Sequence, residues 1–339
     1  MNRRTALTYG ADAGMSLATA EASGVRANGA RVPAHPDDVS PRRAGVLAVD
    51  APVASTVNTH SAKALALSRR ASFIERTDGT ALFYRDWGAG RRPVVFVHSA
   101  GLCSEMWAYQ MMPFVGAGYR CIAFDRRGHG RSSDPGRGYD YDTLADDLAA
   151  VLEVLDVRGA MLVGHSMGCA EIVRYLSRHG TARVSRIALV APTLPYLLKT
   201  EDNPVGVDRA VFDSMRAAWL RDFPRWVEEN APPFFGPSTS PQMVRWGVDM
   251  MASTSLQAII ECNKSVMETD FRAELRELRT PTLIAHGTAD VSAPFEITGK
   301  RAAQLIRGSE LKVYEGAPHG LFITHMEQLN ADLLRFASA

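Results

Sequence analysis

Short runs of consecutive apolar residues recur along most of this 339-residue chain, and each is followed by a loop or a helix-like stretch. Such runs are typical of strands that are buried on both faces of a sheet. They lie at residues 93–98, 121–125, 160–164, 186–191, 281–286 and 311–314. Before them, residues 72–75 and 81–85 flank the turn Thr77-Asp78-Gly79 and predict an antiparallel hairpin.

Helical periodicity fills the segments between these runs. Leu144, Leu148, Val151 and Leu155 recur at the spacing of one helix face, and Asp142 stands where an N-cap is expected. The alternation predicts an α/β fold with a mostly parallel sheet, an antiparallel edge hairpin and helices on both faces. In such folds ligands bind at the carboxyl ends of the strands, so the chemistry should lie in the loops that follow them.

The alternation stops between residues 195 and 270, where aromatic and methionine residues gather and no buried strand is visible. We interpret this segment as a helical lid inserted into an α/β core formed by residues 71–194 and 271–339. Most of its large side chains are expected to pack within the lid itself. A subset should face the substrate, and the pocket candidates are Trp219, Phe235, Trp246 and Met250.

The first seventy residues differ from the rest, being rich in small residues and lacking a sustained period. The start, Asn2-Arg3-Arg4-Thr5-Ala6-Leu7, resembles a twin-arginine export signal, and Ala18-Thr19-Ala20 and Ala20-Glu21-Ala22 resemble cleavage sites. Asp12 interrupts the apolar region, however, and Ala6 stands where such signals carry Phe. A cleaved export signal and a disordered leader on a cytoplasmic protein therefore both stay open.

Composition excludes several classes of function. Lys and Arg number 38 against 37 Asp and Glu, so no net charge attracts nucleic acid. No apolar run approaches the roughly 18 residues of a membrane span. The scattered cysteines indicate neither a disulfide framework nor a zinc site, and we expect no cofactor and no metal; they are Cys103, Cys121, Cys169 and Cys262. The expected partner is a small molecule, and a homo-oligomer stays open.

One short motif carries a specific chemistry. Gly164-His165-Ser166-Met167-Gly168 follows a buried strand and opens a helix, which is the context of a nucleophile elbow. The flanking glycines leave room where strand and helix approach each other, and the serine is held in a strained turn. Ser166 is therefore the candidate nucleophile.

A serine hydroxyl needs a base, and the base needs a carboxylate to orient it. Asp290 and His319 each follow a late buried strand, in the chain order Ser, Asp, His of this motif class. The oxyanion donors would be the N–H groups of Met167 and Ala100. We interpret the segment 125–132, despite its carboxylate and histidine, as a hydrogen-bonded turn. Two further histidines, His98 and His165, are assigned supporting hydrogen bonds.

Together these features make the chain resemble the α/β-hydrolase superfamily, and within it the cofactor-free non-haem haloperoxidase and esterase group. Beyond the elbow, the resemblance rests on Phe96-Val97-His98, residues 125–132, Leu198-Lys199-Thr200-Glu201, Asn203-Pro204, Pro233-Phe234-Phe235-Gly236 and residues 311–320. It implies an α/β-hydrolase fold with Ser166 as nucleophile, His319 as base, Asp290 as orienting acid, and Ala100 with Met167 as oxyanion hole. The implied reaction is carboxylic ester hydrolysis, with perhydrolysis as a side activity.

One departure and several alternatives accompany this resemblance. Relatives usually carry a bulky residue, often Trp, at the position of Ala100, so we expect a wider acyl side here. A lactonase, thioesterase or carbon–carbon bond hydrolase would use the same three residues. A ligand receptor built on the same scaffold is a further alternative, because fold alone does not determine function.

Overall fold

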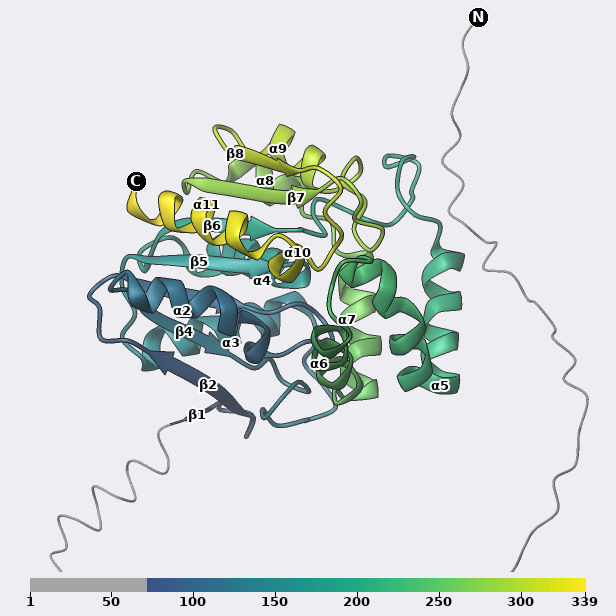
Figure 1. Cartoon of the computed structure of the whole chain (residues 1–339), viewed down its shortest axis with the longest axis horizontal. Coiled ribbons are helices and arrows are strands. Elements are labelled where there is room, and N and C mark those ends of the chain that lie inside the picture. The colour runs from purple at the N-terminus through teal and green to yellow at the C-terminus, as the bar shows by residue number, and fades with distance from the viewer. Residues whose placement is uncertain (1–71) are drawn as a thin grey trace, which may run out of the picture. The chain divides into compact units, whose positions relative to one another are not determined.

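The computed structural model describes residues 72–339, so the predictions for the first seventy residues lie outside the described part of the chain. Eight strands form one sheet in the order β1-β2-β4-β3-β5-β6-β7-β8 (Figure 1). Only the pairs β1–β2 and β2–β4 are antiparallel, which confirms the predicted edge hairpin on a parallel sheet. The strands are β1 (Phe73–Glu75), β2 (Ala81–Trp87), β3 (Pro93–Val97), β4 (Arg120–Phe124), β5 (Ala160–His165), β6 (Val184–Val190), β7 (Thr282–Gly287) and β8 (Glu310–Tyr314).

Helices cover both faces of this sheet, as the alternation predicts (Figure 1). In the α/β part they are the 3₁₀ helix η1 (Ser104–Trp107), α2 (Ala108–Gly116), α3 (Tyr141–Val154), α4 (Met167–His179), α8 (Arg272–Glu277), α9 (Gly299–Leu305), α10 (Leu321–Thr324) and α11 (Met326–Ser338). Between β6 and α8 lie α5 (Arg209–Phe235), α6 (Pro241–Ala252) and α7 (Leu256–Glu268).

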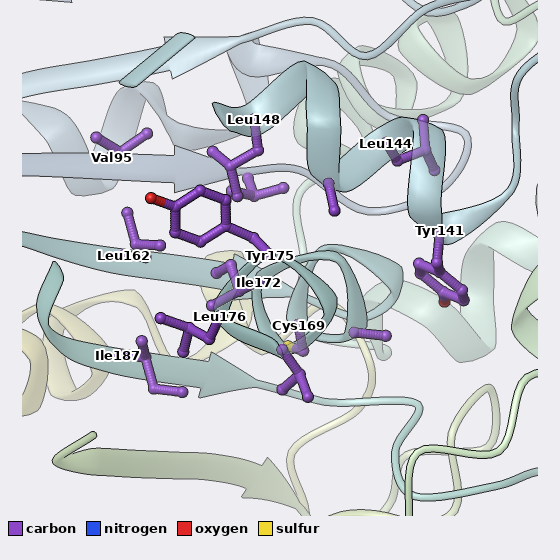
Figure 2. Packing of buried hydrophobic residues seen from close by; sticks show 14 of the residues in the cluster. Val95, Tyr141, Leu144, Leu148, Leu162, Cys169, Ile172, Tyr175, Leu176 and Ile187 are labelled. Carbon is purple, nitrogen blue, oxygen red and sulfur yellow. The ribbon is translucent and has the colours of Figure 1, made fainter. Parts of the chain in front are cut away.

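Successive residues of the central strands point into two separate cores. Val95 and Leu162 belong to the core beneath α3 and α4, together with Leu148 and Ile172 (Figure 2). The next residues along these strands, such as Phe96 and Val163, belong to the opposite core, to which α2 and α11 contribute. Both faces of the central strands β3, β5 and β7 are therefore buried, which is why these strands read as continuous apolar runs.

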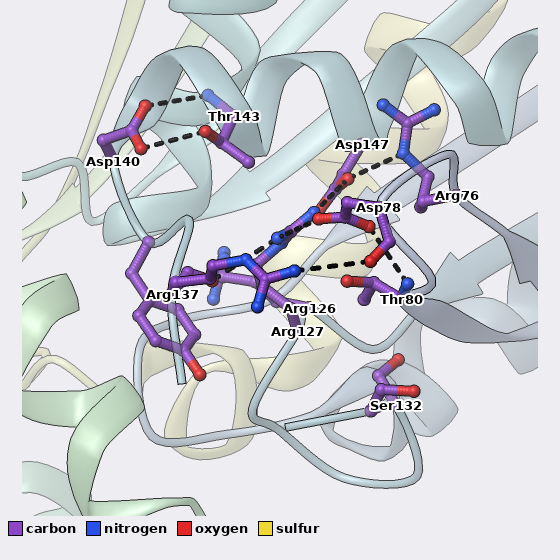
Figure 3. A network of polar contacts seen from close by, with 12 residues as sticks. Arg76, Asp78, Thr80, Arg126, Arg127, Ser132, Arg137, Asp140, Thr143 and Asp147 are labelled. Carbon is purple, nitrogen blue, oxygen red and sulfur yellow. Dashed lines mark hydrogen bonds and ion pairs between the residues drawn. The ribbon is translucent and has the colours of Figure 1, made fainter. Parts of the chain in front are cut away.

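The N-cap of α3 corrects a prediction made from the sequence. The capping residue is Asp140, not Asp142: the carboxylate of Asp140 accepts hydrogen bonds from the backbone N–H and the hydroxyl of Thr143, each at 2.9 Å (Figure 3). The backbone of Asp140 is extended, and the helix starts one residue later because Tyr141 is drawn into the core. Asp142 lies in the first turn and pairs instead with Arg174 and Arg178 of α4.

The segment 125–132 is a hydrogen-bonded turn, which confirms the structural interpretation of that motif. The carboxylate of Asp125 accepts from the N–H of Ser104 at 2.7 Å and from the N–H of Arg131 at 2.8 Å. Gly130 has φ +53°, and a Cβ there would lie 2.2 Å from that carboxylate. Within the same turn, Arg127 pairs with Asp147 of α3 and with Asp78 of the β1–β2 turn, which ties the edge hairpin to the core (Figure 3).

Residues 195–270, for which the sequence predicts a helical lid, contain the helices α5 to α7. Helix α5 is broken at Asp222, where the backbone leaves helical geometry two residues before Pro224. The side chain of Asp222 accepts from the N–H of Arg225 at 3.0 Å and so caps the second half. Within residues 72–339, no helix is long and apolar enough to cross a membrane.

Candidate active site

Ser166 lies in a sharp turn between β5 and α4, with φ +55° and ψ −118°. The predicted strained turn is therefore present. A Cβ on Gly164 would lie 2.7 Å from the backbone of Gly168, and a Cβ on Gly168 would lie 2.5 Å from the carbonyl oxygen of Val97. The two glycines thus allow the start of α4 to press against β5 and the end of β3, which lifts Ser166 to the carboxyl edge of the sheet.

Asp290 and His319 follow β7 and β8 at the same edge, and they are directly bonded. The Nδ1 atom of His319 lies 2.6 Å from Oδ2 of Asp290, and both side chains are buried. The other carboxylate oxygen of Asp290 accepts from the N–H groups of Ser292 at 2.9 Å and Ala293 at 2.8 Å. The loop after β7 therefore fixes the carboxylate, and the carboxylate orients the imidazole.

Burial alone would raise the pKa of Asp290. The charge of His319 and the hydrogen bonds from His286 and His319 outweigh that effect and hold the pKa of Asp290 well below its usual range. Asp290 is consequently ionised at neutral pH. An ionised carboxylate at Nδ1 keeps the proton of a neutral His319 on that atom, which leaves Nε2 with a lone pair able to accept a proton.

A second histidine, for which the sequence motifs predicted no role, contacts this carboxylate. The Nε2 atom of His286, the penultimate residue of β7, lies 3.1 Å from Oδ2 of Asp290 and 2.8 Å from the carbonyl oxygen of Ala293. Gly299 makes room for the ring, since a Cβ there would lie 2.2 Å from Nδ1 of His286. In the sequence, the feature that could have indicated this contact is a histidine near the end of a buried strand, four residues before the predicted acid.

His165 brings Ser166 and His319 into one neighbourhood. Its Nε2 atom lies 2.9 Å from the carbonyl oxygen of His319, and the two rings are 4.8 Å apart between centroids. Burial, followed by the charge of His319, lowers the pKa of His165 to about 3, so its imidazole is neutral and serves as a hydrogen-bonding support. In residues 72–339, no hydrogen bond joins the hydroxyl of Ser166 to His319. In ligand-free sites such catalytic contacts are often long and tighten when substrate binds.

The two oxyanion candidates come from segments that lie against each other. Met167 is the first residue of α4, whose amino end carries a partial positive charge, and Ala100 belongs to the loop after β3. The contact of Gly168 with the backbone of Val97 and His98 brings these segments together. Neither the N–H of Met167 nor that of Ala100 has an acceptor among the described residues, so both are available to a bound ligand.

The four pocket candidates occupy different surroundings. Trp219 belongs to a buried cluster of α5 and α7, against which Ala100 packs. Trp246 packs against the core on the α2 face of the sheet, and its indole N–H donates to Glu105 at 3.1 Å. Phe235 and Met250 belong to the core on the α2 face of the sheet.

Phe234, the neighbour of Phe235 in the chain, packs directly against the candidate base His319. The ring of Phe234 lies 5.3 Å from the ring of His319, edge to face, and its carbonyl oxygen accepts from the N–H of Gly320 at 2.8 Å. Pro232 and Pro233 interrupt the helical pattern just before it, so sequence periodicity could not decide which phenylalanine faces the site.

The chain matches a model of the alpha/beta hydrolase family over residues 94–332. A non-heme chloroperoxidase of Streptomyces lividans is 40% identical over 275 residues, covering 78% of this chain and 99% of that protein. A bifunctional esterase/perhydrolase of Acinetobacter calcoaceticus is 37% identical over 275 residues, covering 78% and 98%. The crystal structure of a bromoperoxidase from Bacillus anthracis has a TM-score of 0.74 at 37% identity, covering 77% of this chain and 96% of that one.

Proposed function

Because this chain belongs to the alpha/beta hydrolase family, we propose that it is a serine hydrolase that cleaves carboxylic esters through Ser166, His319 and Asp290. The observation that carries the proposal is the buried hydrogen bond of 2.6 Å between His319 and Asp290, located at the sheet edge that also bears the strained turn of Ser166. The relative named as an esterase and perhydrolase supports the ester chemistry.

The proposed cycle has two halves. Nε2 of His319 takes the proton of Ser166 as its oxygen attacks the ester carbonyl, while Asp290 stabilises the resulting imidazolium. The N–H groups of Met167 and Ala100 bind the oxyanion, and His319 then gives the proton to the departing alcohol. In the second half, water loses a proton to His319 as its oxygen attacks the acyl carbon. His319 then returns that proton to the oxygen of Ser166 as the acyl–oxygen bond breaks, and the acid is released.

Perhydrolysis is proposed as a side reaction of the same acyl-enzyme. Hydrogen peroxide takes the place of water, its oxygen forms the new bond to the acyl carbon, and the bond to Ser166 breaks. The products are a peracid and the free serine. Support comes from two relatives, one named as a non-heme chloroperoxidase and one as an esterase and perhydrolase.

We further propose that residues 195–270 cover the site as a lid and supply part of the substrate pocket. Phe234 packs against His319, and the hydroxyl of Thr254 donates to the carbonyl oxygen of Gly101 at 3.0 Å, so both the site and the loop of Ala100 contact this segment. Trp219 is the strongest pocket candidate, because its cluster meets Ala100 and its buried indole N–H lacks a partner among residues 72–339.

The test is turnover of p-nitrophenyl esters of graded acyl length, with lactones and a peracid assay alongside. Ser166→Ala should lower turnover by about 10⁴-fold or more while the fold is retained, as loss of a triad member does. His319→Ala should behave similarly. His325→Ala serves as a matched control, because the side chain of His325 hydrogen-bonds only to the hydroxyl of Thr324 among residues 72–339 and its ring packs against Tyr314. A Ser166→Ala protein that keeps most of its rate would exclude the assignment.

A further inference from the structure

A buried arginine in the 125–132 turn is fully engaged next to the candidate oxyanion hole. The side chain of Arg126 is 1% exposed. Its Nε and Nη2 atoms each lie 2.8 Å from Oε2 of Glu171. Nη2 also donates to the carbonyl oxygen of His98 at 2.8 Å, and Nη1 donates to the carbonyl oxygen of Ser99 at 3.3 Å. One guanidinium therefore holds a carboxylate and two successive carbonyl groups.

The ring of His98 makes a further hydrogen bond to the carbonyl oxygen of Ser99. Its Nε2 atom accepts from the backbone N–H of Arg126 at 2.8 Å, so the proton of the neutral imidazole is on Nδ1. Nδ1 then donates to the carbonyl oxygen of Ser99 at 2.6 Å. Burial, followed by the charge of Arg126, keeps the pKa of His98 well below its usual value, which is consistent with the neutral form. With the backbone N–H of Leu102, which donates to the same oxygen at 3.4 Å, three donors thus converge on one carbonyl oxygen.

This carbonyl belongs to the peptide group that presents the candidate oxyanion donor. The peptide between Ser99 and Ala100 is trans, since the only cis bond in the described chain is Leu194-Pro195. In a planar trans peptide the C=O and the N–H point in opposite directions. Fixing the carbonyl of Ser99 consequently fixes the direction of the N–H of Ala100.

The carboxylate that pairs with Arg126 belongs to the helix that carries the other oxyanion donor. Glu171 belongs to α4, the helix whose first residue, Met167, presents the second N–H. Glu171 is fully buried, and it receives both guanidinium bonds on one oxygen. The pair with Arg126 therefore joins the segment that carries one donor to the segment that carries the other.

We propose that Arg126 and Glu171 are positioning residues that set the direction and spacing of the two oxyanion donors. The proposal rests on the ester hydrolysis proposed above. Neither side chain touches the substrate; each acts through the backbone of Ala100 or the helix of Met167. Because the oxyanion forms only on the way to the tetrahedral intermediate, the pair should affect kcat far more than KM.

The test compares Arg126→Lys and Glu171→Gln with wild type and with Arg127→Lys. Arg127 is a matched control: it is the neighbouring buried arginine, and it pairs with the carboxylate of Asp147 away from Ser99. Lysine keeps the charge but cannot reach a carboxylate and two carbonyl groups together. We expect kcat to fall about 10- to 100-fold in both test variants, with KM within about 3-fold of the wild-type value. Complete loss of one oxyanion donor lowers kcat by about 10²- to 10³-fold, and a misaligned donor should cost less than that. Arg127→Lys should keep kcat within about 3-fold.

An alkylboronic acid, which forms a tetrahedral adduct with a catalytic serine, provides a second readout. Its inhibition constant should rise in parallel with the loss of kcat in the test variants and stay unchanged in Arg127→Lys. If Arg126→Lys does not fold, Glu171→Gln, which keeps the shape of the side chain, carries the test. Wild-type kcat or unchanged boronate affinity in a folded test variant overturns the positioning role alone. Wild-type protein without Ser166-dependent turnover overturns the proposed function and this proposal together.

Discussion

The turn at Ser166 stores backbone strain that a substitution can release. Its φ of +55° with ψ of −118° is a conformation that residues with a Cβ rarely adopt. Holding such a residue there costs about 1–3 kcal/mol. Glycine has no Cβ to clash, but its greater freedom in the unfolded chain offsets about 0.5–1 kcal/mol of the gain.

Ser166→Gly should therefore be more stable to unfolding than Ser166→Ala, by about 1 kcal/mol and at most about 2.5 kcal/mol. The alanine variant is the matched control, because it lacks the hydroxyl but keeps the Cβ. Both variants lose the proposed nucleophile and should be inactive on esters, so the stability difference isolates the backbone.

Urea unfolding followed by tryptophan fluorescence measures the difference in the free energy of unfolding. In thermal melts, 1 kcal/mol corresponds to a shift in Tm of about 2–4 °C for a domain of this size. If Ser166→Gly were no more stable than Ser166→Ala, the strain at Ser166 would not exceed the roughly 0.5–1 kcal/mol that glycine costs through the unfolded chain, and the gain of about 1 kcal/mol predicted from this backbone would be refuted.

Three further predictions concern the carboxylate and the pocket. The pKa of Asp290 is depressed by folding, so its ionised form stabilises the fold above the unfolded-chain pKa of about 4, and this contribution is lost as the pH falls further. Asp290→Asn should consequently show a shallower loss of unfolding free energy below about pH 4 in urea titrations; an unchanged slope would contradict the linkage. Trp219→Ala should shift the preferred acyl length in kcat/KM measurements and Trp246→Ala should not, since only Trp219 lies in the cluster that meets Ala100; equal shifts would refute this placement. Ala100→Trp should narrow the acyl side and favour shorter esters, an expectation that fails if the chain-length profile is unchanged.

The sequence predicted the layout of the sheet because burial on both faces leaves an unmistakable pattern. The strand runs and the edge hairpin are found where they were expected. The elbow could be predicted for a related reason. The backbone contacts of Gly164 and Gly168 are too short to permit a side chain, so both positions require glycine and the motif can be recognised in the sequence.

What the sequence could not predict depends on contacts between distant residues. Glu171 pairs with Arg126 across 45 positions, and no local pattern marks either residue as a partner of the other. The choice between Asp140 and Asp142 as N-cap turned on whether Tyr141 enters the core, which is a tertiary effect. The sequence shows that His286 lies near the end of a strand, but it does not show that this residue hydrogen-bonds to the carboxylate of Asp290. That contact depends on how the loop after β7 folds back, which is decided by tertiary packing.

The hydrogen bond from His165 to the carbonyl of His319 spans 154 positions. During synthesis the serine turn therefore leaves the ribosome long before the histidine that is proposed to activate it. A nascent or prematurely terminated chain that ends before β8 lacks the proposed base and leaves β7 as an open sheet edge. Under the proposed mechanism, Ser166 becomes a nucleophile only after the last strand, β8, and His319 have been synthesised. The incomplete chain therefore cannot form an acyl-enzyme while its interior is still exposed.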